Sequence, residues 1–231
     1  MKNIKMFGMA MFAVLFCVGF SACSKDEPQT NPGNEKKLNS IMAYGETGNF
    51  TYDSKNQLIA TKFGSSVYYC SWGKDNFTAA GNYRYYNFTI SGGLFMKAIE
   101  DDGSVAHTFF YNADNKLISL DKNSLTWDGN TLLNVFDNER IRAEFTYGNT
   151  TCKGYFPIAI LIPDELGMDT QDFFYALPEY WGMETNKLPI KVSALHQSGD
   201  ISYTFTEDGY VESCTLLDSY GRAKTFRFTW K

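Results

Sequence analysis

Cys23 is the residue whose surroundings set up the most clearly defined reaction in this chain. It follows the small pair Ser21 and Ala22, which ends an apolar run over residues 6–20. Two lysines precede this run, and the run is too short to span a hydrocarbon layer about 30 Å thick. A basic start, a short apolar middle and small residues before the cut are typical of a secretory signal. We therefore expect cleavage before Cys23, whose thiol would then form a thioether with a diacylglycerol.

The leader resembles that of bacterial lipoproteins, with Phe20 where their usual pattern has Leu. The four residues after the cysteine resemble the acidic export tag of surface lipoproteins in the Bacteroidota. They are Ser24, Lys25, Asp26 and Glu27. These resemblances imply a lipid-anchored protein of the outer membrane that faces the cell exterior, since two long acyl chains make a stable anchor. Two alternatives stay open: a secretory signal cut elsewhere, and an ordinary polar linker.

A second group of residues offers binding chemistry. In the aromatic-rich segment 83–90, the alternation of a strand puts Tyr83, Tyr85 and Asn87 on one face and apolar side chains on the other. Tyrosine combines a large ring with a hydroxyl group, so these three residues are a candidate platform for a sugar ring or a peptide. The alternative is that a loop or helix covers them.

The sequence shows no constellation typical of catalysis. His107 and His196 are the two histidines, and neither belongs to a His-Glu-x-x-His helix. No Gly-x-Ser-x-Gly elbow frames a serine, and no glycine-rich phosphate loop occurs. The acidic groups at 100–102 and 207–208 precede glycines, which indicates turns. We therefore predict no catalytic residue, no metal site and no cofactor.

Charge and cysteine content restrict the partners further. Loss of residues 1–22 would remove two lysines and no acid, so the 21 basic and 26 acidic residues become 19 and 26 and the formal charge becomes −7. Nucleic acid is therefore not an expected partner, because phosphate binding needs clustered basic residues. Cys70, Cys152 and Cys214 lie in strand-like segments. They are interpreted as buried free thiols, with one disulfide as the alternative.

One short phrase recurs along the chain: an aromatic strand end, an Asx or polar residue, two polar residues, Asn or Gly, one more residue and an aliphatic. The clearest copies are residues 50–59, 109–118 and 203–211. In the first copy, Asp53 can start a turn by accepting a backbone N–H bond two residues on. Asn56 and Gly209 are predicted at positive φ, which Asn and Gly tolerate. Each copy therefore predicts a β-hairpin with a four-residue loop.

This phrase resembles the tyrosine–aspartate hairpin repeats of Rhs-type proteins. It is closer to the repeat-bearing domain of unknown function in Bacteroidota lipoproteins. Residues 180–189 are similar to that domain's Gly-then-Asn-x-Leu-Pro stretch. The resemblance implies a fold and an address, and it assigns no activity.

One segment interrupts the hairpins. An apolar run at 156–163 precedes a helical spacing of aromatic residues over 169–181. Asp169 is a candidate N-cap, Gly182 a candidate stop, and Pro178 is expected to kink or end the helix early. Its aromatic stripe is expected to pack on the sheet.

Together these observations predict three parts: a signal peptide (1–22), a lipidated cysteine with a flexible tether (23–37), and one β-rich domain (38–231). We expect a mainly β fold, an antiparallel meander of repeated hairpins that forms a curved sheet or partly closed barrel with one short helix packed on it. The leading function is a non-catalytic binding or adhesion module for a glycan, a peptide or a partner protein. The alternatives are an assembly subunit of an envelope complex and a hydrolase with an unrecognised site.

Overall fold

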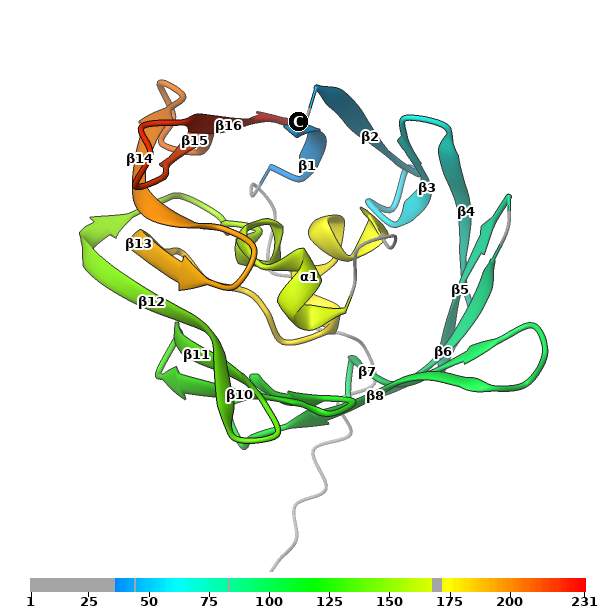
Figure 1. Ribbon diagram of the computed structural model, residues 1–231. Helices are drawn as coiled ribbons and strands as arrows, with labels where there is room; N and C mark the ends of the chain where they lie inside the picture. Colours follow the sequence, from blue (N-terminus) through cyan, green and yellow to red (C-terminus); the bar gives the residue numbers. More distant parts are fainter. Residues whose placement is uncertain (1–35, 44, 83, 168–171) are drawn as a thin grey trace, which may run out of the picture. The chain divides into compact units, whose positions relative to one another are not determined.

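The computed structural model describes residues 36–43, 45–82, 84–167 and 172–231. In these residues, sixteen strands form one closed antiparallel barrel, in which β1 (Leu38–Ala43) pairs with β16 (Ala223–Trp230) (Figure 1). The predicted mainly β meander is confirmed. The meander closes fully, so no strand edge is left free to pair with another chain.

The strands between these two follow one another around the barrel. They are β2 (Glu46–Tyr52), β3 (Leu58–Phe63), β4 (Ser66–Trp72), β5 (Asn76–Gly81), β6 (Tyr85–Ser91), β7 (Leu94–Glu100), β8 (Val105–Tyr111), β9 (Leu117–Leu120), β10 (Asn123–Asp128), β11 (Thr131–Asp137), β12 (Arg140–Thr151), β13 (Lys187–Ala194), β14 (Ser198–Phe205) and β15 (Val211–Leu217). No helix in the described part of the chain is long and apolar enough to cross a membrane.

The two ends of the barrel domain meet. Lys37 N donates to Lys231 O at 2.8 Å, and Lys231 N donates to Lys37 O at 3.0 Å. Odd-numbered strands therefore begin at this end of the barrel and even-numbered strands finish there. We call it the tether end, because residues 1–35 precede it in the chain, and we call the opposite end the far end.

The repeated phrase forms the turns that its residues predict. Asp53 Oδ1 accepts the backbone N–H groups of Lys55 at 2.8 Å and Gln57 at 2.9 Å. Asn112, Asp218 and Thr206 hold their turns through side-chain oxygens in the same way. The positive φ predicted for Asn56 and Gly209 is confirmed, at 60° and 90°.

The aromatic residue of the phrase also has a structural role. Tyr52 Oη donates to Leu38 O at 2.8 Å, so the end of β2 is bonded to the start of β1. Six other even-numbered strands repeat this bond, from Trp72, Tyr111, Trp127, Tyr147, Tyr203 and Trp230. A half-buried ring needs such a partner for its polar atom. These donors therefore fix the register of successive hairpins at the tether end.

Between β12 and β13 the chain enters the barrel interior, and we call this part, residues 152–167 and 172–186, the inner segment (Figure 1). Its helices are η1 (Ile158–Leu161), α1 (Pro163–Leu166), η2 (Asp172–Ala176) and η3 (Pro178–Tyr180). The predicted helix at 169–181 is thus two short 3₁₀ helices, because Pro178 has no N–H to continue the first one. Asp169, the candidate N-cap, lies outside the described residues. Gly182 turns the chain at φ 68°.

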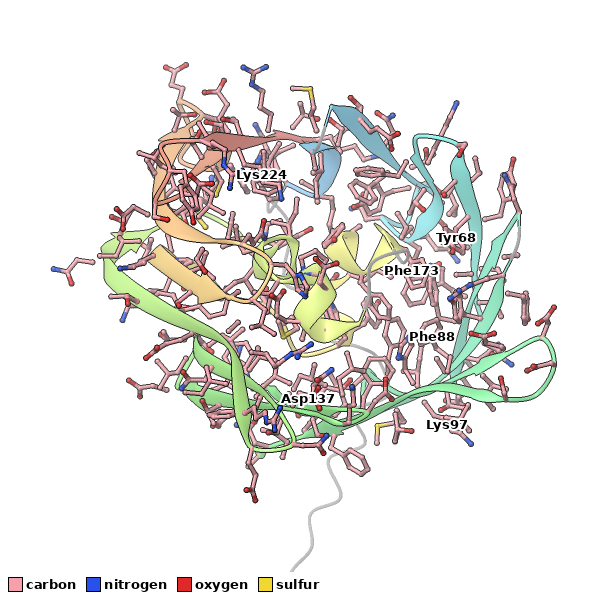
Figure 2. The ribbon with its side chains drawn as sticks, viewed as in Figure 1. Tyr68, Phe88, Lys97, Asp137, Phe173 and Lys224 are labelled. Atoms are coloured by element: carbon pink, nitrogen blue, oxygen red, sulfur yellow. The ribbon has the colours of Figure 1, made fainter. Side chains whose placement is uncertain are left out.

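Aromatic rings join the inner segment to opposite walls. Phe173 lies 5.4 Å from Tyr68 of β4 and 5.8 Å from Phe88 of β6, measured between ring centroids (Figure 2). Across the barrel, Phe156 lies 5.6 Å from Tyr203 and 6.0 Å from Phe228. The aromatic stripe packs on the sheet as predicted, and it does so on the inner face, inside the barrel.

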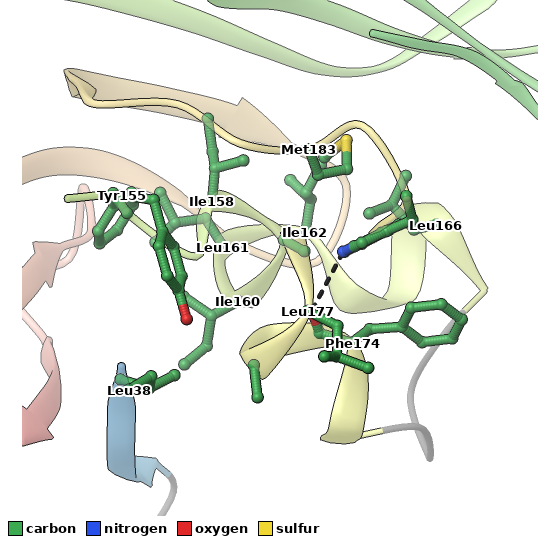
Figure 3. Close-up of a cluster of buried hydrophobic side chains, with 14 of the residues drawn as sticks. Leu38, Tyr155, Ile158, Ile160, Leu161, Ile162, Leu166, Phe174, Leu177 and Met183 are labelled. Carbon is green, nitrogen blue, oxygen red and sulfur yellow. Dashed lines mark hydrogen bonds between the residues drawn. The ribbon is translucent and has the colours of Figure 1, made fainter. Parts of the chain in front are cut away.

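Aliphatic side chains fill the space between these aromatic contacts. Figure 3 shows Ile158, Ile160, Leu161, Ile162 and Leu177 packed together, all of them buried. Nearby, Trp181 Nε1 donates to Phe174 O at 3.1 Å, which satisfies the buried indole. The interior of the barrel is therefore an apolar core.

Polar side chains line parts of the outer wall. On β16, Phe226 and Phe228 are buried, whereas Thr225, Arg227 and Thr229 are exposed, as their alternation predicts. Hydroxyl groups pair across strands on the outside of the barrel, and their oxygens lie 2.6 to 2.9 Å apart. The pairs are Ser40 with Thr229, Ser71 with Thr78, Thr204 with Ser213, and Thr215 with Thr225.

Candidate functional site

The predicted lipidation site lies outside the described residues. Cys23, and the export tag of Ser24, Lys25, Asp26 and Glu27, all precede residue 36, where the described chain begins. These assignments stay predictions. The described chain starts at the tether end, so any anchor on Cys23 would attach there.

The candidate platform lies on β6. Tyr83 is outside the described residues, whereas Tyr85 and Asn87 are both on the outer face of this strand. Tyr85 is 38 % exposed, and its neighbours Tyr86 and Phe88 are buried in the core. The predicted division of this strand into an apolar and a polar face is confirmed for these four residues.

Strand register brings a second tyrosine beside Tyr85. Ala80 of β5 pairs with Tyr69 of β4 on one side and with Tyr85 on the other. Tyr69 is 67 % exposed. Two strand spacings separate the tyrosine backbones, a distance of roughly 10 Å. Ala80, which has only a single methyl group, therefore stands between two exposed tyrosines on the outer wall.

The next row of the sheet supplies polar groups. Thr78 pairs with Ser71 on one side and with Asn87 on the other, and the oxygens of Ser71 and Thr78 lie 2.6 Å apart. The Asn87 side chain makes no hydrogen bond with the described part of the chain, and its Oδ1 is covered by neighbouring atoms. We name this surface the wall platform. It consists of Tyr69, Ser71, Thr78, Ala80, Tyr85 and Asn87.

Tyr69 was not among the residues predicted for the platform. The sequence contains its signal: in the pair Tyr68 and Tyr69, strand alternation requires one ring to point inward and the other outward. The pairing with Ala80 and Tyr85, however, depends on the register of three strands, and no local pattern gives that register.

No family model matches the chain, and no curated protein matches it in sequence. Solved structures do match its fold. A porin-like protein from Bacteroides uniformis has a TM-score of 0.56 and 13 % identity, over 85 % of this chain and 96 % of that one. A porin-like protein from Bacteroides vulgatus has a TM-score of 0.58 and 13 % identity, over 85 % of this chain and 99 % of that one. At this identity the likeness establishes a shared barrel fold. The resemblance to tyrosine–aspartate repeats stays a prediction.

A second surface feature lies at the far end. A hollow of about 380 Å³ opens between the β13–β14 loop and the β15–β16 hairpin, and we call it the far-end hollow. Its lining residues are Ala194, Leu195, His196, Gln197, Ser198, Leu216, Asp218, Ser219, Tyr220, Arg222, Ala223 and Lys224.

Three residue types of a hydrolase triad line this hollow, but they are not arranged as one. Ser198 Oγ donates to Ala194 O at 2.7 Å and accepts Ala194 N–H at 2.8 Å, so this hydroxyl closes its own loop. Both Asp218 oxygens hold the adjacent turn and Arg222. In the described residues, neither Ser198 nor Asp218 bonds to the His196 ring. The hollow therefore offers no serine activated by a histidine.

The other titratable clusters have structural roles. His107, buried on β8, has Nδ1 2.7 Å from Asp121 Oδ2, and Asp121 Oδ1 also accepts Thr108 N–H at 2.8 Å. This pair fastens the turn after β9 to β8. The three acids at 100–102 bring carboxylate oxygens within 4.8 Å of one another in an exposed hairpin. There Asp102 accepts Ser104 N–H at 2.8 Å, which is the turn role that the sequence predicts.

The three cysteines of the barrel are free and buried. Burial raises the pKa of Cys70, Cys152 and Cys214 from 9.0 to about 12. Their thiols stay protonated at neutral pH and are poor nucleophiles. They serve as small core residues, as predicted.

Proposed function

We propose that this chain is a non-catalytic, lipid-anchored binding protein of the outer membrane, whose wall platform holds an extended glycan. The observation that carries the proposal is the pair of exposed rings, Tyr69 and Tyr85, on either side of Ala80. Tyrosine rings offer apolar faces for stacking and hydroxyl groups for hydrogen bonds. Ser71 and Thr78, in the next row, add hydroxyl groups that suit a sugar better than an apolar peptide.

Two observations support a location at the outer membrane. The leader ends at Cys23 with the layout of a lipoprotein signal, and the acidic tag that follows supports export to the cell surface. Two structures of similar fold are described as porin-like and come from Bacteroides.

The side chains of the barrel argue that it stands outside the bilayer. A barrel that crosses a membrane carries an outward apolar band about 25 Å tall and a polar interior. Here the exposed face of β16 consists of Thr225, Arg227 and Thr229, and the interior is filled by the inner segment. We infer that Cys23 and the tether hold the barrel at the membrane surface, with the wall platform in water.

Binding is tested on a glycan array with the purified full chain in detergent. Tyr69→Ala and Tyr85→Ala should each weaken binding severalfold, since each removes an exposed ring face on which a sugar can lie. Phe205→Ala is the matched control, because Phe205 is an exposed aromatic residue of β14 that belongs to neither the wall platform nor the far-end hollow. Full binding by both platform variants would reject the platform.

The anchor is tested separately by fractionation. Cys23→Ser should release the chain from membranes or leave it unprocessed, and normal processing with full membrane retention would contradict the anchor. Protease treatment of intact cells then distinguishes the outward from the periplasmic face, with a periplasmic protein as control.

One observation favours an assembly subunit as the second candidate. Phe110 of β8 is 55 % exposed, and Ile118 of the adjacent strand β9 is also exposed. A contiguous exposed apolar patch, of the kind that neighbouring side chains such as these can form, marks a protein contact. Phe110→Ser should then dissociate a complex seen by sedimentation of the detergent-solubilised chain, whereas a wild-type chain that sediments as a monomer and is pulled down alone would oppose this candidate.

A further inference from the structure

The far-end hollow has the properties of a second binding site, and its position comes from the topology. Odd-numbered strands begin at the tether end, so the loops that follow β13 and β15 both lie at the far end. These loops form the two sides of the hollow. With the anchor at the tether end, the hollow would point away from the membrane.

The floor of the hollow is tied to the inner segment. His196 N donates to Glu165 Oε1 at 3.2 Å, and Gln197 Nε2 donates to the carbonyl oxygens of Ile160 and Leu161. On the other side, Lys224 Nζ donates to Gln197 Oε1 at 2.8 Å. The β13–β14 loop is therefore joined both to the core and to β16, which makes the hollow a preformed site.

The charged side of the hollow keeps hydrogen-bond donors available. Asp218 Oδ1 accepts the N–H groups of Tyr220 and Arg222, both at 2.9 Å, and Oδ2 accepts Arg222 Nε at 2.7 Å. Within the described residues, the terminal nitrogens of Arg222 and the ring nitrogens of His196 make no hydrogen bond. Arg222 thus keeps its two-pronged end available for a carboxylate.

The positive charge of Lys224 offsets the negative charges of the acids below the hollow. Burial lowers the pKa of Lys224, whereas the negative charges of Asp164 and Glu165 favour its protonated form. The donors left for a ligand are therefore those of Arg222 and His196.

The rim of the hollow is apolar and aromatic. Tyr220 is 83 % exposed, with the Arg222 guanidinium 5.2 Å from its ring centroid, and Leu195 opposite is 61 % exposed. A ring-shaped ligand can lie against these side chains while Arg222 holds its charge. Ser219 and Gln197 add polar groups at the edge.

From this combination we propose that the far-end hollow binds a sugar acid, a sugar ring that carries a carboxylate. The carboxylate pairs with Arg222 and His196, and the ring lies between Tyr220 and Leu195. This site does not depend on the wall platform, which lies on other strands, β4 to β6.

The test is calorimetric titration of the detergent-solubilised full chain with D-glucuronate. Glucose, which lacks the carboxylate, and acetate, which lacks the ring, are the matched probes. We expect saturable binding of glucuronate at millimolar concentration or below, and at least tenfold weaker binding of both controls. No heat from glucuronate, or equal affinity for either control, would overturn the proposal.

Two variants locate the binding. Arg222→Gln keeps a polar stem and loses the guanidinium, and His196→Ala removes an exposed ring without hydrogen bonds to the described chain, so it leaves the fold intact. Both should weaken glucuronate binding, by at least tenfold for Arg222→Gln. Phe205→Ala, an exposed aromatic residue of β14 outside both proposed sites, should leave it unchanged. Undiminished binding by both hollow variants, with thermal unfolding as in the wild type, would place the sugar acid elsewhere and reject the assignment.

Discussion

Two glycines with positive φ give a quantitative test of how closely the inner segment approaches the barrel wall. Gly182 has φ 68° and Gly209 has φ 90°, so alanine is strained at either position by about 1–2 kcal/mol. Their surroundings differ. A Cβ on Gly182 would lie 2.6 Å from Asn115 O and 2.7 Å from Leu117 N, whereas one on Gly209 would meet only Lys153 Cβ, at 3.7 Å.

Both close contacts at Gly182 are with backbone atoms, so no side-chain rotation relieves them. The turn after β8 or the inner segment must move, which weakens the bond from Leu117 N to Gly182 O (3.2 Å) and adds about 1–3 kcal/mol. We expect Gly182→Ala to lower the free energy of unfolding by about 2–5 kcal/mol and Gly209→Ala by about 1–2 kcal/mol.

Urea denaturation of the two variants and the wild type measures this difference directly. Both alanines carry the strain of a positive φ, so the difference between their two losses of unfolding free energy reports the close contacts at Gly182 alone. Equal losses for the two variants would refute the close approach of the inner segment to the β8–β9 turn.

Three further predictions follow from the filled interior. Phe174→Ala should destabilise the chain by about 3–5 kcal/mol in urea, because the ring is buried against Phe88, Phe109 and Trp181; a loss near zero would mean that the inner segment is not core. The buried thiols, whose folded pKa is raised to about 12, hold their protons where unfolded thiols lose them, so the free energy of unfolding should fall as pH rises from about 9 to about 12; a Cys70→Ala, Cys152→Ala and Cys214→Ala triple variant should make this slope less steep, and an unchanged slope would contradict the thiol contribution. The full chain should give no channel conductance in planar lipid bilayers, and steady single-channel steps would reject a filled barrel outside the membrane.

Much of this barrel could be predicted from sequence because each repeated hairpin is held by interactions between residues a few positions apart. Asp53 and Asn56 each act within one loop, and the Asx bond and the positive φ follow from residue type alone. The alternation on β16 likewise predicts its buried and exposed faces. Closure could not be predicted in this way, because the pairing of β1 with β16 joins residues nearly the whole domain apart.

The inner segment shows the same limit. Its apolar run and aromatic spacing indicate burial, and they do not distinguish a cover on a sheet from a filling inside a barrel. That choice depends on the number of strands that surround it, since an isolated sheet would leave one face of Phe173 and Phe156 without partners. The candidate platform was likewise found only in part, with Tyr85 and Asn87 but without Tyr69.

Fold likeness and side-chain chemistry lead to different functional conclusions for this barrel. The porin-like neighbours have a similar fold. A pore, however, needs a polar channel inside and an apolar band outside, and β2 and β16 have the reverse distribution. With the interior occupied by its own core, the barrel has only its outer surfaces left for contact with other molecules. Functional searches should therefore concentrate on the wall platform and the far-end hollow, which combine exposed tyrosines with polar groups on a rigid sheet.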